Sequence, residues 1–267
     1  MKKSLVLAAA VAAVLANAAF ASERSHKVRK HDDPPPAPVQ TWAGCYVGGN
    51  AGGGFGLRTA DRGTINVFNP VVAAGIGIPT SYRVSDHGAI GGGQIGCNYR
   101  NGTFVYGIEA DIQGSGLLGS STVTTVPGGI FDSTTGTAQQ RLNWFGTVRG
   151  RFGFTPSENL LLYGTAGLAY GGVKDSATLV FSAPADGNYA GANSGAKVGW
   201  TAGVGAEYAL AANWSIKFEY LFVDLGKTNL QILDPTRPGQ YMIYTFREQD
   251  NVLRVGLNYK FGGAFVP

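Results

Sequence analysis

Residues 104–113, FVYGIEADIQ, alternate apolar side chains with polar or small ones at a period of two. This is the period of a β-strand, in which successive side chains point to opposite faces of the sheet. The second face of this strand carries two carboxylates, Glu109 and Asp111. From Trp42 onward the same alternation recurs without a helical period, so the sequence predicts an all-β protein.

The pattern predicts eight strands, at about 42–57, 86–99, 104–113, 141–154, 160–173, 197–210, 214–225 and 250–261. Tight turns are expected at 101–102, 155–159 and 211–213. They alternate with four longer segments rich in Gly, Ser, Thr, Asn and Pro, near 59–85, 114–140, 174–196 and 227–249. Alternating short turns and long loops are typical of bacterial outer-membrane barrels, whose short turns lie in the periplasm.

The lengths of the three tight turns also predict which residues face each other across the hairpins. In each hairpin apolar side chains then meet apolar ones, and a slip of one residue would destroy this match. The expected partners are Tyr99 with Phe104, Phe152 with Leu162, Leu210 with Trp214, Tyr208 with Ile216, and Glu207 with Lys217.

The apolar face carries more aromatic side chains than the narrow interior of an eight-stranded barrel can hold. We therefore expect it to face lipid, with aromatic girdles near the strand ends. Leu142, Trp144 and Val204 are assigned to this face, and Arg141 and Asn143 to the polar interior. Buried charges are tolerated when they are paired, and an interior ion-pair network is predicted from Glu109, Asp111, Arg149, Arg151, Glu207, Lys217, Glu219 and Arg254. The alternative is a soluble lipocalin-like barrel or sandwich.

The N-terminal region predicts export. Residues 1–21 have a basic start, an apolar stretch and an A-x-A site at 19–21, which is typical of a signal peptide rather than a membrane anchor. Residues 22–41 are basic and then Pro-rich, which indicates a periplasmic linker with a possible peptidoglycan contact. The barrel is assigned to 42–261 and a C-terminal extension to 262–267. The net charge of +4 is too small to indicate a nucleic-acid partner.

The two cysteines, Cys45 and Cys97, are 52 positions apart and have no metal-binding spacing. Both fall on the lipid-facing parity of neighbouring strands, near the short-turn end. In an oxidising compartment a disulfide between them is possible, and two free cysteines packed against lipid are the alternative.

Several segments resemble strands of a known family: WAGCYVGGNAGGGFG, GGGQIGCNYRNGTFVYGIEADIQ, LNWFGTVRGRFGF and NVLRVGLNYKF. The family is that of the alphaproteobacterial outer-membrane immunogenic proteins, with opacity-type barrels similar to the transmembrane part of outer-membrane protein A. The resemblance covers nearly all of residues 42–261. It implies an eight-stranded antiparallel up-and-down transmembrane β-barrel with a polar interior and a lipid-facing apolar exterior.

The resemblance also implies partners for assembly, namely outer-membrane lipid, periplasmic chaperones and the barrel-assembly machinery. The last strand resembles the signal that this machinery reads, carried by Gly256, Tyr259 and Phe261. Two departures stand out: GGAFVP follows Phe261, and cysteines occupy 45 and 97, where the resemblance predicts aromatic residues.

For function, the resemblance implies a structural, surface-exposed protein of the cell envelope. A barrel plugged by its own ion pairs needs no ligand, so no cofactor is expected. A narrow porin-like channel is one alternative. The other is binding of haem or a host component through loop residues, for which the candidates are Tyr82, His87, Tyr189, Tyr241 and Tyr244. No Ser/His/Asp set can be assigned, so no enzyme is expected.

Overall fold

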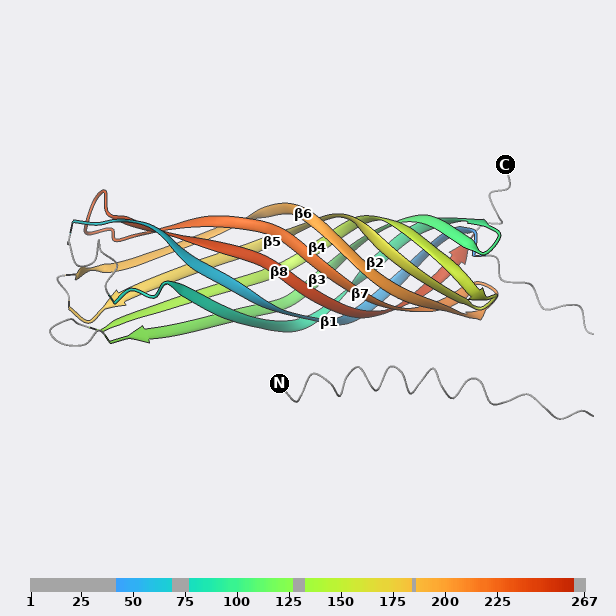
Figure 1. Cartoon of the computed structure of the whole chain (residues 1–267), viewed down its shortest axis with the longest axis horizontal. Coiled ribbons are helices and arrows are strands. Elements are labelled where there is room, and N and C mark those ends of the chain that lie inside the picture. The colour runs from blue at the N-terminus through green and yellow to red at the C-terminus, as the bar shows by residue number, and fades with distance from the viewer. Residues whose placement is uncertain (1–41, 69–76, 127–132, 184–185, 262–267) are drawn as a thin grey trace, which may run out of the picture. The chain divides into compact units, whose positions relative to one another are not determined.

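The computed structural model describes residues 42–68, 77–126, 133–183 and 186–261. The predicted signal peptide, the linker and the C-terminal extension lie outside the described residues. Eight antiparallel strands form a closed barrel in which each strand pairs with its neighbours in sequence and the last pairs with the first (Figure 1). They are β1 (Gly44–Asn66), β2 (Ser81–Asn101), β3 (Phe104–Thr125), β4 (Thr134–Ser157), β5 (Leu160–Phe181), β6 (Asn188–Ala211), β7 (Trp214–Leu233) and β8 (Tyr241–Phe261).

The two ends of the barrel differ in their connections. β2–β3, β4–β5 and β6–β7 are joined by two residues each, 102–103, 158–159 and 212–213. These turns lie at the end where β1 begins and β8 ends (Figure 1). The other connections, 67–80, 126–133, 182–187 and 234–240, are longer. The predicted fold class is confirmed. Within the described residues, no helix is long and apolar enough to cross a membrane.

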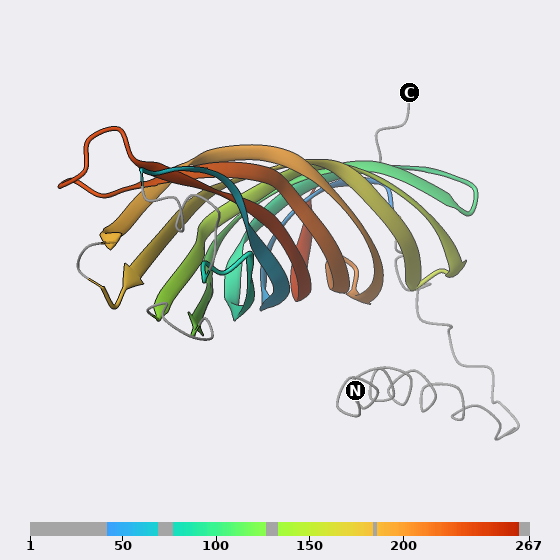
Figure 2. The same cartoon turned by 60° about the vertical axis from the view of Figure 1, so that its left-hand side comes forward.

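The strands are longer than the sequence pattern predicted. Each has 20 to 24 residues, whereas about 9–11 are needed to span a membrane. Figure 2 shows the strands continuing toward the end with the longer connections. Much of the sequence assigned to loops is therefore strand, although β6 and β7 do not pair between Ala190 and Trp200.

The chemistry of the added strand segments explains the difference. Their outward face is polar: the hydroxyl groups of Thr122 and Thr137 lie 3.1 Å apart, as do those of Thr124 and Thr135. Their inward face is apolar and forms a buried cluster. The alternation of polar and apolar side chains continues, but the polar face is now outside and the apolar face inside. The segments are therefore rich in Ser and Thr, a composition that is typical of loops.

The predicted registers are partly correct. Glu207 lies opposite Lys217 and Tyr208 opposite Ile216, as predicted, but a bulge pairs Trp214 with Ala211 instead of Leu210. The other two hairpins are shifted by two residues from the prediction, so that Tyr99 pairs with Tyr106 and Phe154 with Leu162. A shift of two leaves every side chain on its predicted face.

The shift in the β2–β3 hairpin comes from its turn. β2 runs on to Asn101, which pairs with Phe104, and the turn is Gly102-Thr103 rather than Asn101-Gly102. Gly102 adopts a φ of +61°, a left-handed conformation that favours glycine.

Two face assignments on β4 are wrong. Leu142 is buried inside the barrel, and Arg141 is exposed outside. The register of β4 against β5 shifts between Leu142 and Trp144, which leaves Asn143 as an extra residue. A β-bulge of this kind reverses the direction of every side chain beyond it. Residues on the other side of the bulge, such as Trp144 and Val148, face outward as predicted.

Candidate functional site

The interior of the barrel is filled by five layers, in which apolar clusters alternate with charged ones. Nearest the short turns is a small apolar cluster of Trp42, Val105, Leu161, Tyr163 and Ala209. The first charged layer follows, and then an apolar cluster built around Leu117, Leu142, Phe145 and Val252. A second charged layer separates this cluster from the apolar interior of the strand extensions. The side chains that fill the lumen determine whether a solute or a ligand could enter the barrel.

The first charged layer contains all eight residues of the predicted network, and all are buried. Glu109 lies at its centre. The ammonium group of Lys217 is 2.8 and 2.9 Å from the two carboxylate oxygens of Glu109, and the guanidinium group of Arg149 contacts the same carboxylate. Arg151 and Arg254 approach it at 3.4 and 3.5 Å.

The remaining carboxylates of this layer have cationic partners of their own. Asp111 lies 3.0 Å from Arg149 and 2.9 Å from Arg254, and Glu219 lies 3.1 Å from Arg149. With four carboxylates and four cationic groups, the layer has no net formal charge. A buried network is tolerated when its charges are paired and hydrogen-bonded in this way.

The expected partnership of Glu207 and Lys217 is the exception. Their backbones face each other, but Glu207 lies 2.7 Å from Arg151 and accepts hydrogen bonds from Ser215 and Asn258, whereas Lys217 reaches Glu109. Register alone therefore does not determine which side chains pair in this interior, because several long side chains reach across the narrow lumen.

The second charged layer was not predicted. Arg58 lies 3.1 Å from Asp86, 3.1 Å from Glu248 and 2.7 Å from Asp250. Gln140 donates a hydrogen bond of 2.6 Å to Glu248. These residues stand in or beside segments that were assigned to loops, so their inward parity was not considered. Continuation of the period-two pattern through 58 and 248–250 is the signal that would have found them.

The cysteines and the proposed assembly signal lie at the seam where the barrel closes. Cys45 and Cys97 are joined by a disulfide between β1 and β2, and Cys45 also pairs across the sheet with Phe261 of β8. Tyr259 points outward and packs against Trp214, with ring centroids 5.1 Å apart. At Gly256 an added methyl group would enter the interior, 2.9 Å from Gln94 and 3.0 Å from Lys217. Reading of the last strand by assembly machinery stays a prediction.

The candidate haem ligands lie in strands rather than in loops, and the five do not gather at one site. Tyr82 and Tyr244 pack against each other inside the barrel with ring centroids 5.6 Å apart, and Tyr189 is buried and hydrogen-bonded to Gln240. His87 points outward from β2. Within the described residues, no three His, Cys, Asp or Glu side chains gather as a metal site.

Asp234 begins the connection between β7 and β8 and is its most engaged carboxylate. Its carboxylate accepts hydrogen bonds from the hydroxyl and backbone N–H groups of Thr236, and from the N–H of Asn188 at 3.1 Å. The hydrogen bonds from Thr236 hold the pKa of Asp234 below its usual range. These hydrogen bonds join the connection between β7 and β8 to the first residue of β6.

The outer surface divides into zones. A wide apolar belt includes Ile108, Leu168 and Val204, with exposed fractions of 68%, 61% and 62%. Aromatic pairs flank the belt on both sides, for example Tyr106–Phe152 near the short turns and Trp144–Tyr170 on the other side. An apolar belt between aromatic girdles, on a closed barrel with a charged interior, defines an outer-membrane β-barrel.

Comparison with known proteins agrees with the assignment to outer-membrane β-barrels. The model of the outer membrane protein beta-barrel domain family matches residues 5–261, and the chain belongs to this family. It is 38% identical over 263 residues to the 31 kDa outer-membrane immunogenic protein of Brucella melitensis, covering 97% of this chain and all of that one. The 22 kDa outer membrane protein of Rhizobium leguminosarum is 27% identical, with 85% and 82% of the two chains covered.

Among solved structures, that of OprG from Pseudomonas aeruginosa is similar at 13% identity and a TM-score of 0.46, covering 84% of this chain and 99% of that one. The relatives are alphaproteobacterial outer-membrane proteins, so the predicted family and outer-membrane location are confirmed.

The lipid-facing belt predicts a depth-dependent cost of charge. Val204→Arg, in the middle of the belt, should destabilise the barrel by about 2–4 kcal/mol, because an arginine would face hydrocarbon. Val180→Arg is the matched control: Val180 also faces outward, with 47% exposed, but lies in the strand extension. It should cost at most about 1 kcal/mol. Urea unfolding in lipid vesicles measures both, and equal costs would contradict the assigned belt.

Proposed function

We propose that this protein is a structural, surface-exposed component of the outer membrane that contributes to the cell envelope, with its four longer connections on the extracellular side. The observation that carries the proposal is the filled interior. A lumen closed by its own ion pairs and apolar clusters needs no ligand for its stability and leaves little space for a diffusing solute.

The porin-like alternative has weaker support. Water-filled porins have many more strands and a lumen open to water. Here three apolar layers cross the path of an ion, and large side chains such as Phe145, Leu117 and Phe246 are fully buried within two of them. The binding of haem through the candidate tyrosines loses support because three of them are packed inside. An enzymatic role has no assignable set of catalytic residues.

Two measurements test the proposal. In planar bilayers, the chain from residue 22 should show no reproducible unitary conductance, while a general porin inserted in the same way provides the positive control. Flotation with liposomes verifies that the protein has inserted. Discrete, concentration-dependent channel steps from the wild-type protein would refute a purely structural role.

The envelope role is tested in cells. A deletion strain should become more sensitive to detergent and to large antibiotics, and the wild-type gene should restore resistance. The Val180→Arg variant, which is expected to fold, should restore it as well, whereas Val204→Arg should not. Unchanged sensitivity of the deletion strain would argue against the proposed contribution to the envelope.

A further inference from the structure

Five basic side chains point outward just beyond the outer aromatic girdle. Positions along each strand can be counted from the short-turn end. The girdle lies at the eleventh to fourteenth positions and includes Phe55, Tyr170, Trp200 and Trp144, and the five basic residues lie at the fourteenth to nineteenth positions. We call these five the basic collar: Arg83 on β2, Arg141 on β4, Lys174 on β5, Lys227 on β7 and Arg247 on β8. All are exposed.

The collar contains two pairs of like charges in direct opposition. Arg141 faces Lys174 across β4 and β5, and Lys227 faces Arg247 across β7 and β8. Like charges that face each other on neighbouring strands are destabilising. Among the described residues, no carboxylate lies within ion-pair distance of any of the four. The part of the chain that the structure describes therefore leaves both pairs without an ion-paired carboxylate.

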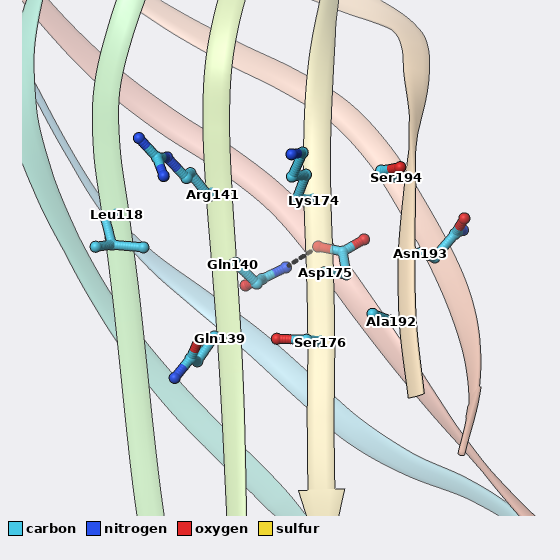
Figure 3. Close-up of a pocket in the computed structure, with 10 residues that line it drawn as sticks. All are labelled: Leu118, Gln139, Gln140, Arg141, Lys174, Asp175, Ser176, Ala192, Asn193 and Ser194. Carbon is cyan, nitrogen blue, oxygen red and sulfur yellow. Dashed lines mark hydrogen bonds between the residues drawn. The ribbon is translucent and has the colours of Figure 1, made fainter. Parts of the chain in front are cut away.

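The pair on β4 and β5 borders a hollow of about 570 Å³ on the barrel wall. Backbone pairing places Leu118 opposite Arg141, and Lys174 between Arg141 and Ser194. Figure 3 shows Arg141, Lys174 and Ser194 at the upper side of the hollow, with Gln139, Ser176 and Ala192 at its lower side. One carboxylate, that of Asp175, also lines the hollow. It is buried and already engaged, by Gln140 at 3.3 Å and by Lys197 at 3.4 Å.

The surroundings match a lipid headgroup region. Directly beneath the pair, the indole of Trp144 lies over Gly172, where an added methyl group would come within 2.4 Å of its Nε1. Polar outward residues such as Thr137 and Thr178 lie on the other side. The cations thus stand at the boundary between the apolar belt and the polar wall, where headgroups of the surrounding lipid lie.

We propose that the basic collar binds the phosphate groups of an anionic lipid in the outer leaflet, with Arg141 and Lys174 forming the principal site and Lys227 and Arg247 a second one. A guanidinium group provides paired donors to phosphate oxygens, and an ammonium group adds a point charge. The second site borders a smaller hollow of about 250 Å³, which also contains Asp61. This inference goes beyond the structural role, and it rests on the proposed orientation, in which the end with the longer connections faces the outside of the cell.

Native mass spectrometry of the chain from residue 22 in a neutral detergent tests the proposal, with diphosphorylated lipid A as the probe. The Arg141→Gln/Lys174→Gln variant should bind it about thirtyfold more weakly, since each of the two basic residues near a membrane surface contributes about 1 kcal/mol. Addition of Lys227→Gln/Arg247→Gln should weaken binding further. The matched control is Arg100→Gln/Lys260→Gln, which removes the same two residue types at the short-turn end and should leave binding unchanged.

Two further arms identify the source of the phosphate. Dephosphorylated lipid A and phosphatidylethanolamine should bind with equal, low affinity to wild-type and variant proteins, and inorganic phosphate should compete only weakly. Unchanged binding of diphosphorylated lipid A by the quadruple variant would overturn the proposal. Efficient competition by inorganic phosphate would overturn the assignment to a lipid. Heat-modifiable mobility in gels verifies that each variant is folded, and ion conductance has no influence on this measurement.

Discussion

Glu109→Gln is expected to destabilise the barrel by about 3–5 kcal/mol, the usual cost of removing one member of a buried ion pair. The loss should be large because Glu109 has the most cationic neighbours in its layer: Lys217 at 2.8 Å, Arg149, Arg151 at 3.4 Å and Arg254 at 3.5 Å. Gln keeps the shape but leaves four cationic groups against three carboxylates in an interior that is closed on both sides by apolar layers. Urea unfolding in lipid vesicles measures the change.

The matched control is Glu158→Gln, the same chemical change in the exposed β4–β5 turn. It should change stability by less than about 0.5 kcal/mol. In a double-mutant cycle, Lys217→Met combined with Glu109→Gln should recover part of the loss, because it restores the balance of charges. Additive costs for these two changes would mean that the contact between Lys217 and Glu109 contributes no coupling energy.

The first charged layer was predictable because its residues lie in the parts of the strands where apolar and polar side chains alternate regularly. Glu109 and Asp111 alternate with Tyr106, Ile108 and Ile112, and the face of each residue follows from parity alone. Errors of two residues in the β2–β3 and β4–β5 registers left this assignment intact. The sequence could not predict which charged side chains form ion pairs, because Glu207 and Lys217 both reach past the neighbouring strands to residues on other strands.

The half of the barrel farther from the short turns was not predicted, because there the polar face is on the outside and the apolar face on the inside. Near the short turns the outward face is apolar. Beyond the aromatic girdle, polar residues such as Thr122 and Thr137 face outward, and Tyr82 and Tyr244 face inward. A composition rich in Ser, Thr and Gly therefore indicated loops. The bulge at Asn143 added a second error, because one extra residue reverses parity without any marked change in composition.

Loss of the Cys45–Cys97 disulfide is the other change with a large expected effect. The two residues are 52 positions apart. For a loop of this length, the restriction of the unfolded chain is worth about 4 kcal/mol, with measured effects of about 2–4 kcal/mol. The Cys45→Ala/Cys97→Ala variant should therefore show a lower urea midpoint in lipid vesicles, with the slope of the transition reflecting any change in the compactness of the unfolded chain.

Reductant separates the bond from the packing of the sulfur atoms. Dithiothreitol should lower the midpoint of the wild-type protein toward that of the double variant and leave the double variant unchanged. Because Cys45 also pairs with Phe261, the bond fixes β1 against β2 at the position where β8 closes the barrel. The reduced protein should then fold more slowly into its heat-modifiable form. Alkylation of both thiols in the unfolded protein without reductant, or equal stability with and without it, would contradict this role.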